Sequence, residues 1–137
     1  MSPAEIEAEL SSRINIIEEA YEFMLAYASQ GLSTDQGNDT GRQAREYLTR
    51  CDAAMSGLPG VFTRYVEDES LKPAAPYDAF IAVIERDAKD SQAAIQLVLA
   101  QRAISSQMVD NLNASIHLRA LLTDLFLIDE IFKSRRS

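Results

Sequence analysis

Few residues in this sequence could support chemistry, and the clearest group is three glutamates, Glu18, Glu19 and Glu22. On a helix, a spacing of four residues places Glu18 and Glu22 one turn apart on the same face. Two carboxylates in this arrangement could share a Mg²⁺ ion, which prefers oxygen ligands. Alternatively, the glutamates form a solvated acidic face opposite the apolar stripe of an amphipathic helix. The sequence favours this solvated face over the metal site.

The segment Glu18-Glu19-Ala20-Tyr21-Glu22 also resembles half of the metal site of the MazG-like all-helical nucleotide pyrophosphohydrolases. The resemblance implies a small Mg²⁺-dependent nucleotide hydrolase whose metal would be held by these glutamates. In that family the motif continues with Glu-x-x-Asp on the next helix, and the second predicted helix of this chain lacks that pair. A hydrolase is therefore the alternative function, and a non-enzymatic protein is preferred.

His117 is the only histidine, which excludes binuclear metal sites that need paired histidine ligands. His117 and Asp124 are seven residues apart, so a helix would nearly align them, two turns from each other. Nothing in the sequence supplies a nucleophile or a cofactor motif beside them. We therefore predict a polar seam between helices or subunits, and we expect no cofactor.

A second polar group interrupts the apolar face of the preceding predicted helix at Arg102, Ser105 and Ser106. An arginine beside two small hydroxyl residues could bind an anion. Together with His117, Arg102 could line the pocket of a small-ligand sensor, which is a further alternative function. The favoured interpretation is structural pairing of Arg102 with an acid, such as Asp124 or a residue of the first helix.

The composition is typical of one acidic globular domain spanning residues 1–137. Apolar residues make up 47% of the chain, charged residues 25%, and the net charge is −8. This balance argues against nucleic acid as a partner, because nucleic-acid binders carry a basic patch. The N-terminal segment lacks the layout of a signal peptide, and charges interrupt the most apolar stretch. No membrane span is predicted, and a cytoplasmic protein is expected.

Strong start and stop signals bound the first predicted helix. Ser2 and Glu5 have the spacing of a capping box around a proline that suits the first helical position. Gly31 can adopt the left-handed conformation that ends a helix. We expect a helix over about 3–30, followed by a polar loop at 33–39 that has nothing to bury and should be among the most mobile segments.

The remaining sequence predicts three more helices. Thr40 has capping-box spacing for the second, and the Gly-Leu-Pro-Gly segment at 57–60 must kink or stop it. A second connection covers 67–76. Residues 77–135 are helical in pattern, with a break expected near 111–115, and one helix of about sixty residues is the alternative. Four main helices with short links predict an all-α four-helix up-down bundle or a close relative, with a kinked second helix.

The other helices are expected to fold around the apolar stretch from Ile116 to Phe132, which has two apolar faces when placed on a helix. The first face comprises Leu118, Leu121, Leu125, Ile128 and Phe132, and the second comprises Ile116, Ala120, Leu127 and Ile131. A lone bundle would leave part of the second face in water, which a monomer rarely tolerates.

We therefore predict a homodimer, whose two copies would bury the same surface across a two-fold axis. The residues expected at or near this interface are Ile116, His117, Ala120, Asp124, Leu127 and Ile131. The preferred function is a non-enzymatic helical module that binds other protein chains, as an accessory protein, adaptor or assembly factor.

Overall fold

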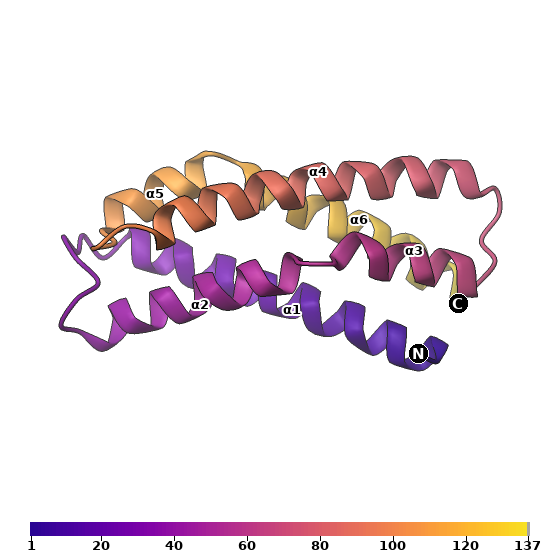
Figure 1. The fold of residues 1–137 in the computed structure, drawn as a ribbon, viewed down its shortest axis with the longest axis horizontal. Helices are drawn as coiled ribbons and strands as arrows, with labels where there is room; N and C mark the ends of the chain where they lie inside the picture. Colours follow the sequence, from indigo (N-terminus) through magenta and orange to yellow (C-terminus); the bar gives the residue numbers. More distant parts are fainter. Residues whose placement is uncertain (137) are drawn as a thin grey trace.

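The computed structural model describes residues 1–136, and the described chain is all-α, with six helices and no strand (Figure 1). The helices are α1 (Pro3–Ala28), α2 (Asp39–Met55), α3 (Leu58–Asp68), α4 (Ala74–Leu99), α5 (Ser106–Ala114) and α6 (His117–Arg136). Figure 1 shows α3 continuing in the general direction of α2, while α5 and α6 run back along α4. None of the described helices is both long and apolar enough to cross a membrane.

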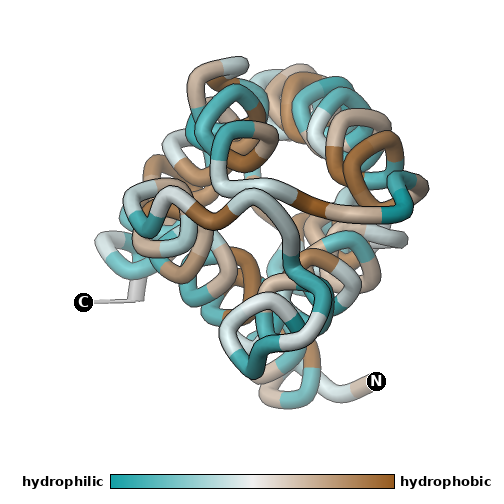
Figure 2. Tube along the Cα trace, turned by 90° about the vertical axis from the view of Figure 1, so that its left-hand side faces the viewer, coloured by the Kyte–Doolittle hydropathy of each residue, from teal (hydrophilic) through white to brown (hydrophobic). Residues whose placement is uncertain are grey.

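All six helices contribute to one cluster of buried apolar side chains. The end-on view in Figure 2 shows the helices surrounding this shared interior. The first apolar face predicted for the last helix is buried from Leu118 to Phe132. The Phe132 ring stacks on Tyr65 of α3, with 4.1 Å between ring centroids, so the end of α6 is anchored on α3.

The predicted start of α1 is confirmed. The Glu5 amide donates to Ser2 Oγ at 3.2 Å, and the Ser2 amide donates to Glu5 Oε1 at 3.2 Å. The helix ends at Ala28, and Gly31 is left-handed, with φ of +66°. These local hydrogen bonds satisfy backbone groups that a helix end leaves free, which explains why the sequence alone could place them.

The predicted cap of the second helix is wrong. Asn38 caps α2, accepting from the Gly41 amide at 2.6 Å, and Thr40 lies inside the helix. Thr40 and Asn38 are both good capping residues, so local propensity does not choose between them. The break expected at 57–60 is present, because α2 ends at Met55 and left-handed Gly57, with φ of +76°, precedes α3.

Residues 77–135 contain two breaks rather than one. The break expected near 111–115 is present, since α5 ends at Ala114 and Ile116 is left-handed, with φ of +65°. A second break separates α4 from α5 at 100–105, and the apolar pattern did not predict it. Contacts with distant residues, described below, hold this second turn.

Candidate functional site

The exposed part of the predicted second face of α6 lines an apolar groove between the end of α6 and the start of α4. Its volume is about 380 Å³, and it is lined by Pro73, Pro76, Tyr77, Phe80, Leu127, Ile128 and Ile131. Leu127 is 52% exposed and Ile131 is 38% exposed, although both are large apolar residues. The two lie one helical turn apart on the same stripe, so α6 presents them together. The groove therefore brings two residues predicted for the interface together with apolar residues of α4.

The predicted interface residues do not form one continuous helical stripe. Ile116 precedes α6 in a left-handed conformation and is exposed, so the prediction that it belongs to the helical face is wrong. Its amide hydrogen-bonds to the Asn113 carbonyl at 3.4 Å as the chain turns between α5 and α6. Ala120 is half-buried. Of the four apolar residues predicted for the dimer interface, Leu127 and Ile131 line the groove, whereas Ile116 and Ala120 do not.

Asp124 meets another carboxylic acid and not a basic residue. Asp124 is half-buried, and its Oδ2 atom is buried without a hydrogen-bond partner. Burial, followed by the nearby Asp87 side chain, raises the pKa of Asp124 to about 7. The predicted pairing of Asp124 with Arg102 is therefore wrong.

Arg102, Ser105 and Ser106 do not share a helical face, because they lie in and just after the turn between α4 and α5. Ser105 caps α5 by accepting from the Met108 amide at 3.1 Å. Buried Ser106 donates to the Tyr27 carbonyl at 2.6 Å and accepts from the Leu32 amide at 3.0 Å. The hydroxyl groups of both serines thus have backbone partners, and the predicted helical arrangement for an anion site is wrong.

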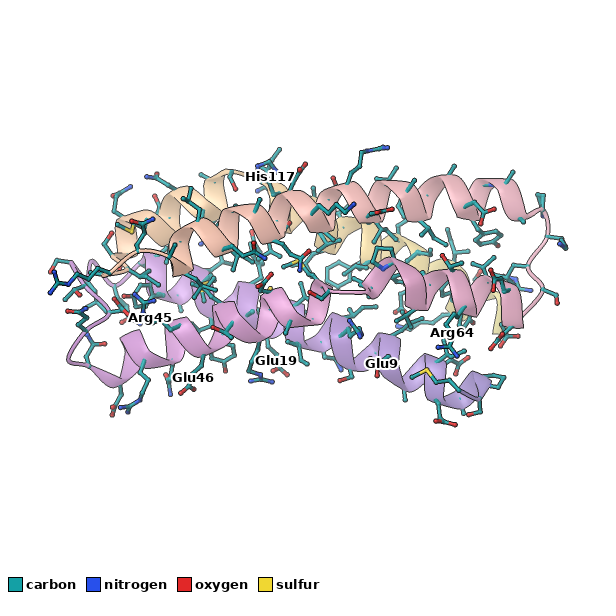
Figure 3. All side chains as sticks on the ribbon, viewed as in Figure 1. Glu9, Glu19, Arg45, Glu46, Arg64 and His117 are labelled. Atoms are coloured by element: carbon teal, nitrogen blue, oxygen red, sulfur yellow. The ribbon has the colours of Figure 1, made fainter. Side chains whose placement is uncertain are left out.

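An ion pair that the sequence analysis did not single out holds this turn. Asp35, in the loop predicted to have nothing to bury, is 6% exposed and accepts from Arg45 Nε at 2.5 Å and from the Ile104 amide at 2.6 Å. Arg45 also donates to the carbonyls of Leu99 and Gln101, at 3.2 Å and 2.8 Å. In Figure 3, Arg45 lies at the end of the molecule where this loop meets the α4–α5 turn.

The prediction that loop 33–39 buries nothing is therefore wrong. The local sequence carries no signal for this contact, because an acid in a polar loop and an arginine ten residues later are both ordinary surface patterns. Arg45 and Asp35 have structural roles, since they join the loop, α2 and the end of α4.

The three glutamates of the hydrolase alternative do not form a metal site with other acids. Glu18 is half-buried, whereas Glu19 and Glu22 are exposed. Across the described residues, no group of three or more His, Cys, Asp or Glu side chains is arranged to hold a metal ion. Figure 3 shows Glu19 on the lower side of the bundle and His117 on its upper side, so these two candidate residues do not meet.

Replacing Glu18 and Glu22 together by glutamine is expected to change the free energy of unfolding by less than about 0.5 kcal/mol, because the substitutions remove charge from an acidic helix surface. Urea unfolding with and without Mg²⁺ measures this change. A Mg²⁺-dependent gain in stability that the double variant loses would contradict the surface interpretation and support the hydrolase.

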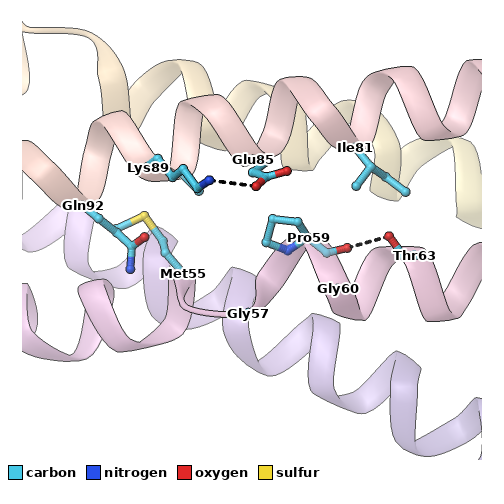
Figure 4. A pocket seen from close by; sticks show the side chains of 10 residues that line it. Met55, Gly57, Pro59, Gly60, Thr63, Ile81, Glu85, Lys89 and Gln92 are labelled. Atoms are coloured by element: carbon cyan, nitrogen blue, oxygen red, sulfur yellow. Dashed lines mark hydrogen bonds and ion pairs between the residues drawn. The ribbon is translucent and has the colours of Figure 1, made fainter.

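A second cleft, of about 400 Å³, lies beside the break between α2 and α3 (Figure 4). Its polar side chains already have protein partners. Lys89 pairs with Glu85 at 2.9 Å, and Thr63 Oγ1 donates to the Pro59 carbonyl at 3.1 Å. Gln92 donates to the Asp52 carbonyl at 3.0 Å. This cleft shows no nucleophile beside a general base.

Comparison with known proteins identifies no relative: no family model, no curated protein and no solved structure matches this chain. The geometry of the site is therefore the basis for a functional argument.

Proposed function

We propose that this protein is a non-enzymatic helical module that binds protein chains, and that it first associates with a second copy of itself through the groove between α4 and α6. The observation that carries the proposal is the exposure of Leu127 and Ile131 beside Tyr77 and Phe80 in one apolar groove. Contiguous apolar surface of this kind is typical of interaction sites, because leaving it in water is unfavourable.

A two-fold arrangement suits this surface. In a symmetric dimer the same patch serves both copies, so one apolar groove is covered by its equivalent. The net charge of −8 opposes close approach of two copies, and an apolar contact is the kind of interface that offsets this repulsion. Within the same proposal, the six helices form a four-helix up-down bundle in which α2 with α3, and α5 with α6, each act as one interrupted rod.

The hydrogen bonds made by the buried polar side chains support a binding role over a catalytic one. Ser106 and Asp35 are buried and hydrogen-bonded to the backbone, and Ser105 caps a helix. Each of these side chains has a structural task at its position. The groove, in contrast, is lined almost wholly by apolar side chains, which suit binding by burial of surface.

Leu127→Glu is expected to weaken self-association at least tenfold, because the new carboxylate would have to be buried unpaired in the contact. Sedimentation equilibrium at micromolar concentration measures the association. Thr123→Glu is the matched control, since it adds the same charge one turn earlier at an exposed position outside the groove. The control is expected to associate like the wild type.

Two results would contradict the proposal. One is a wild-type protein that sediments as a single species at the 15.2 kDa monomer mass over the whole concentration range. The other is an equal loss of association in the Leu127→Glu and Thr123→Glu variants, which would show that added charge, and not the groove, controls assembly.

A further inference from the structure

A second apolar groove, the α4–α5 groove, lies between the end of α4 and helix α5, which runs back along α4 (Figure 1). Leu97 is 67% exposed, more than any other large apolar side chain of the described chain, and Met108 on the opposite wall is 38% exposed. The groove has a volume of about 390 Å³, and no charged residue is among those that line it, which are Ala94, Leu97, Val98, Gln101, Met108, Asn111, Leu112 and Ser115. Burial of this surface under another chain would therefore be favourable.

The stripe of α4 that enters this groove begins with an acid. Phe80 of the α4–α6 groove, Asp87, and Ala94 of the α4–α5 groove follow one another at intervals of seven residues. A helix places residues at this spacing nearly in line, about 10 Å apart along its axis. Asp87 is half-buried and Asp90 is exposed, and neither takes part in an ion pair among the described residues. Uncompensated negative charge thus lies next to the apolar groove.

The charges at the two ends of the α4–α5 groove favour one kind of chain. Asp87 and Asp90 precede its α4 residues, and Arg102 follows them at the far end. Arg86, which adjoins Asp87 in the chain, is exposed and forms no ion pair with either acid in the described part of the structure. Because the net charge is −8, a second copy would bring further negative charge to the acidic end, whereas a basic segment would be attracted to it.

We propose that the α4–α5 groove binds an amphipathic helix of another protein chain, whose apolar face lies on Leu97 and Met108 and whose basic residues lie over Asp87 and Asp90. This inference rests on the proposed function, because it names the kind of chain that such a module binds. A helix suits the groove, since two neighbouring helices form a channel into which a third can pack its apolar face. The flexible side chain of Met108 can adapt to the shape of that face.

The site for the partner helix is separate from the site for self-association. Phe80 and Val98, one from each groove, are eighteen residues apart on α4, which corresponds to five turns and about 27 Å. The two grooves have no lining residue in common. A dimer joined through the α4–α6 groove is therefore expected to leave the α4–α5 groove of each copy open, so that each copy can bind one helix.

Fluorescence anisotropy with the full-length protein tests the apolar part of the site. The probe is a fluorescein-labelled helical peptide of about eighteen residues, or five turns, with leucine on one face and lysine on the other. Leu97→Glu is expected to weaken binding of this peptide at least about tenfold, because the new carboxylate would face the leucine side chains. Added negative charge by itself attracts a lysine-rich peptide, so this loss would come from the groove. Leu25→Glu, at an exposed leucine of α1 outside both grooves, is the matched control and should bind like the wild type.

Asp87→Asn tests the acidic end of the site. It is expected to weaken binding of the same peptide about threefold, the effect of one partly exposed charge pair. Asp78→Asn removes the same charge from an exposed position of α4 outside the groove, and its effect should be smaller. Equal effects of the two substitutions would overturn the assignment of a basic partner.

Two results would overturn the inference as a whole. One is the absence of peptide binding at concentrations up to about 100 μM, and the other is equal binding by the wild type and Leu97→Glu. Sedimentation of the wild type without peptide separates this inference from the proposed self-association. A monomeric wild type that binds the peptide, and loses binding on Leu97→Glu substitution, would contradict only the self-association.

Discussion

Asp35→Ala is expected to lower the free energy of unfolding by about 2–4 kcal/mol, although the residue lies in a polar loop. Asp35 is 6% exposed, and its carboxylate accepts from the Ile104 amide at 2.6 Å and from Arg45 Nε at 2.5 Å. Alanine would leave a buried amide without an acceptor and a half-buried guanidinium without its counter-charge. The Arg45 side chain is 33% exposed, so water screens part of the second loss, and the range given includes this reduction.

The ion pair between Asp35 and Arg45 also makes the stability of the fold sensitive to acid. Burial alone would raise the pKa of Asp35, but the Ile104 amide and the Arg45 guanidinium outweigh it and hold that pKa below its ordinary value. The folded state therefore binds this proton less readily than the unfolded state does. The stability contributed by Asp35 is complete above the ordinary pKa near 4 and is lost as the pH falls below it.

Urea unfolding at pH 7 measures the Asp35→Ala effect, and Asp39→Ala is its matched control. Asp39 follows Asp35 closely in sequence and pairs with Arg42, but both of these side chains are highly exposed. Asp39→Ala is expected to lower the free energy of unfolding by less than about 1 kcal/mol, because it removes only an exposed ion pair and a favourable interaction with the helix dipole. Equal destabilisation by the two substitutions would show that the buried contacts of Asp35 do not carry its effect.

Gly41→Ala is expected to destabilise the protein by about 2–3 kcal/mol, because the backbone of the loop passes directly over this residue. A Cβ atom at Gly41 would lie 2.0 Å from the Asp35 carbonyl oxygen and 2.4 Å from the Asp35 Cα. Both are backbone atoms, so no side-chain rotation can relieve the overlap. The loop cannot simply move away, since the Asp35 carboxylate is bonded to Arg45 and Ile104.

Gly60→Ala is the same chemical change, and we expect it to have the opposite effect on stability. Gly60 lies in α3, has no positive φ, and a Cβ there would meet no atom within 4 Å. Alanine restricts the unfolded chain and favours helix, so this variant should be about 0.5–1 kcal/mol more stable than the wild type. Thermal and urea unfolding of the two variants side by side measure both effects. Changes of the same sign would contradict the clash at Gly41.

The groove could be predicted only in part from the sequence. The apolar stripe of the last helix indicated that Leu127 and Ile131 would be available for contact, because periodicity reports which residues share a face. The opposite wall, formed by Tyr77 and Phe80, depends on how α4 and α6 are aligned. Such an alignment is set by packing between segments far apart in the chain, and no local pattern encodes it.

The sequence by itself determined the features whose physical cause is local. These features are the capping box at Ser2, the left-handed Gly31, the break after the second helix at 57–60 and the buried face of α6, each of which depends on residues within a few turns of one another. Only the tertiary structure decided where α4 ends. The turn at 100–105 exists because Arg45 binds the carbonyls of Leu99 and Gln101, and because Asp35 binds the Ile104 amide. Backbone groups released from a helix must find other partners, and here those partners come from residues more than fifty positions earlier in the chain.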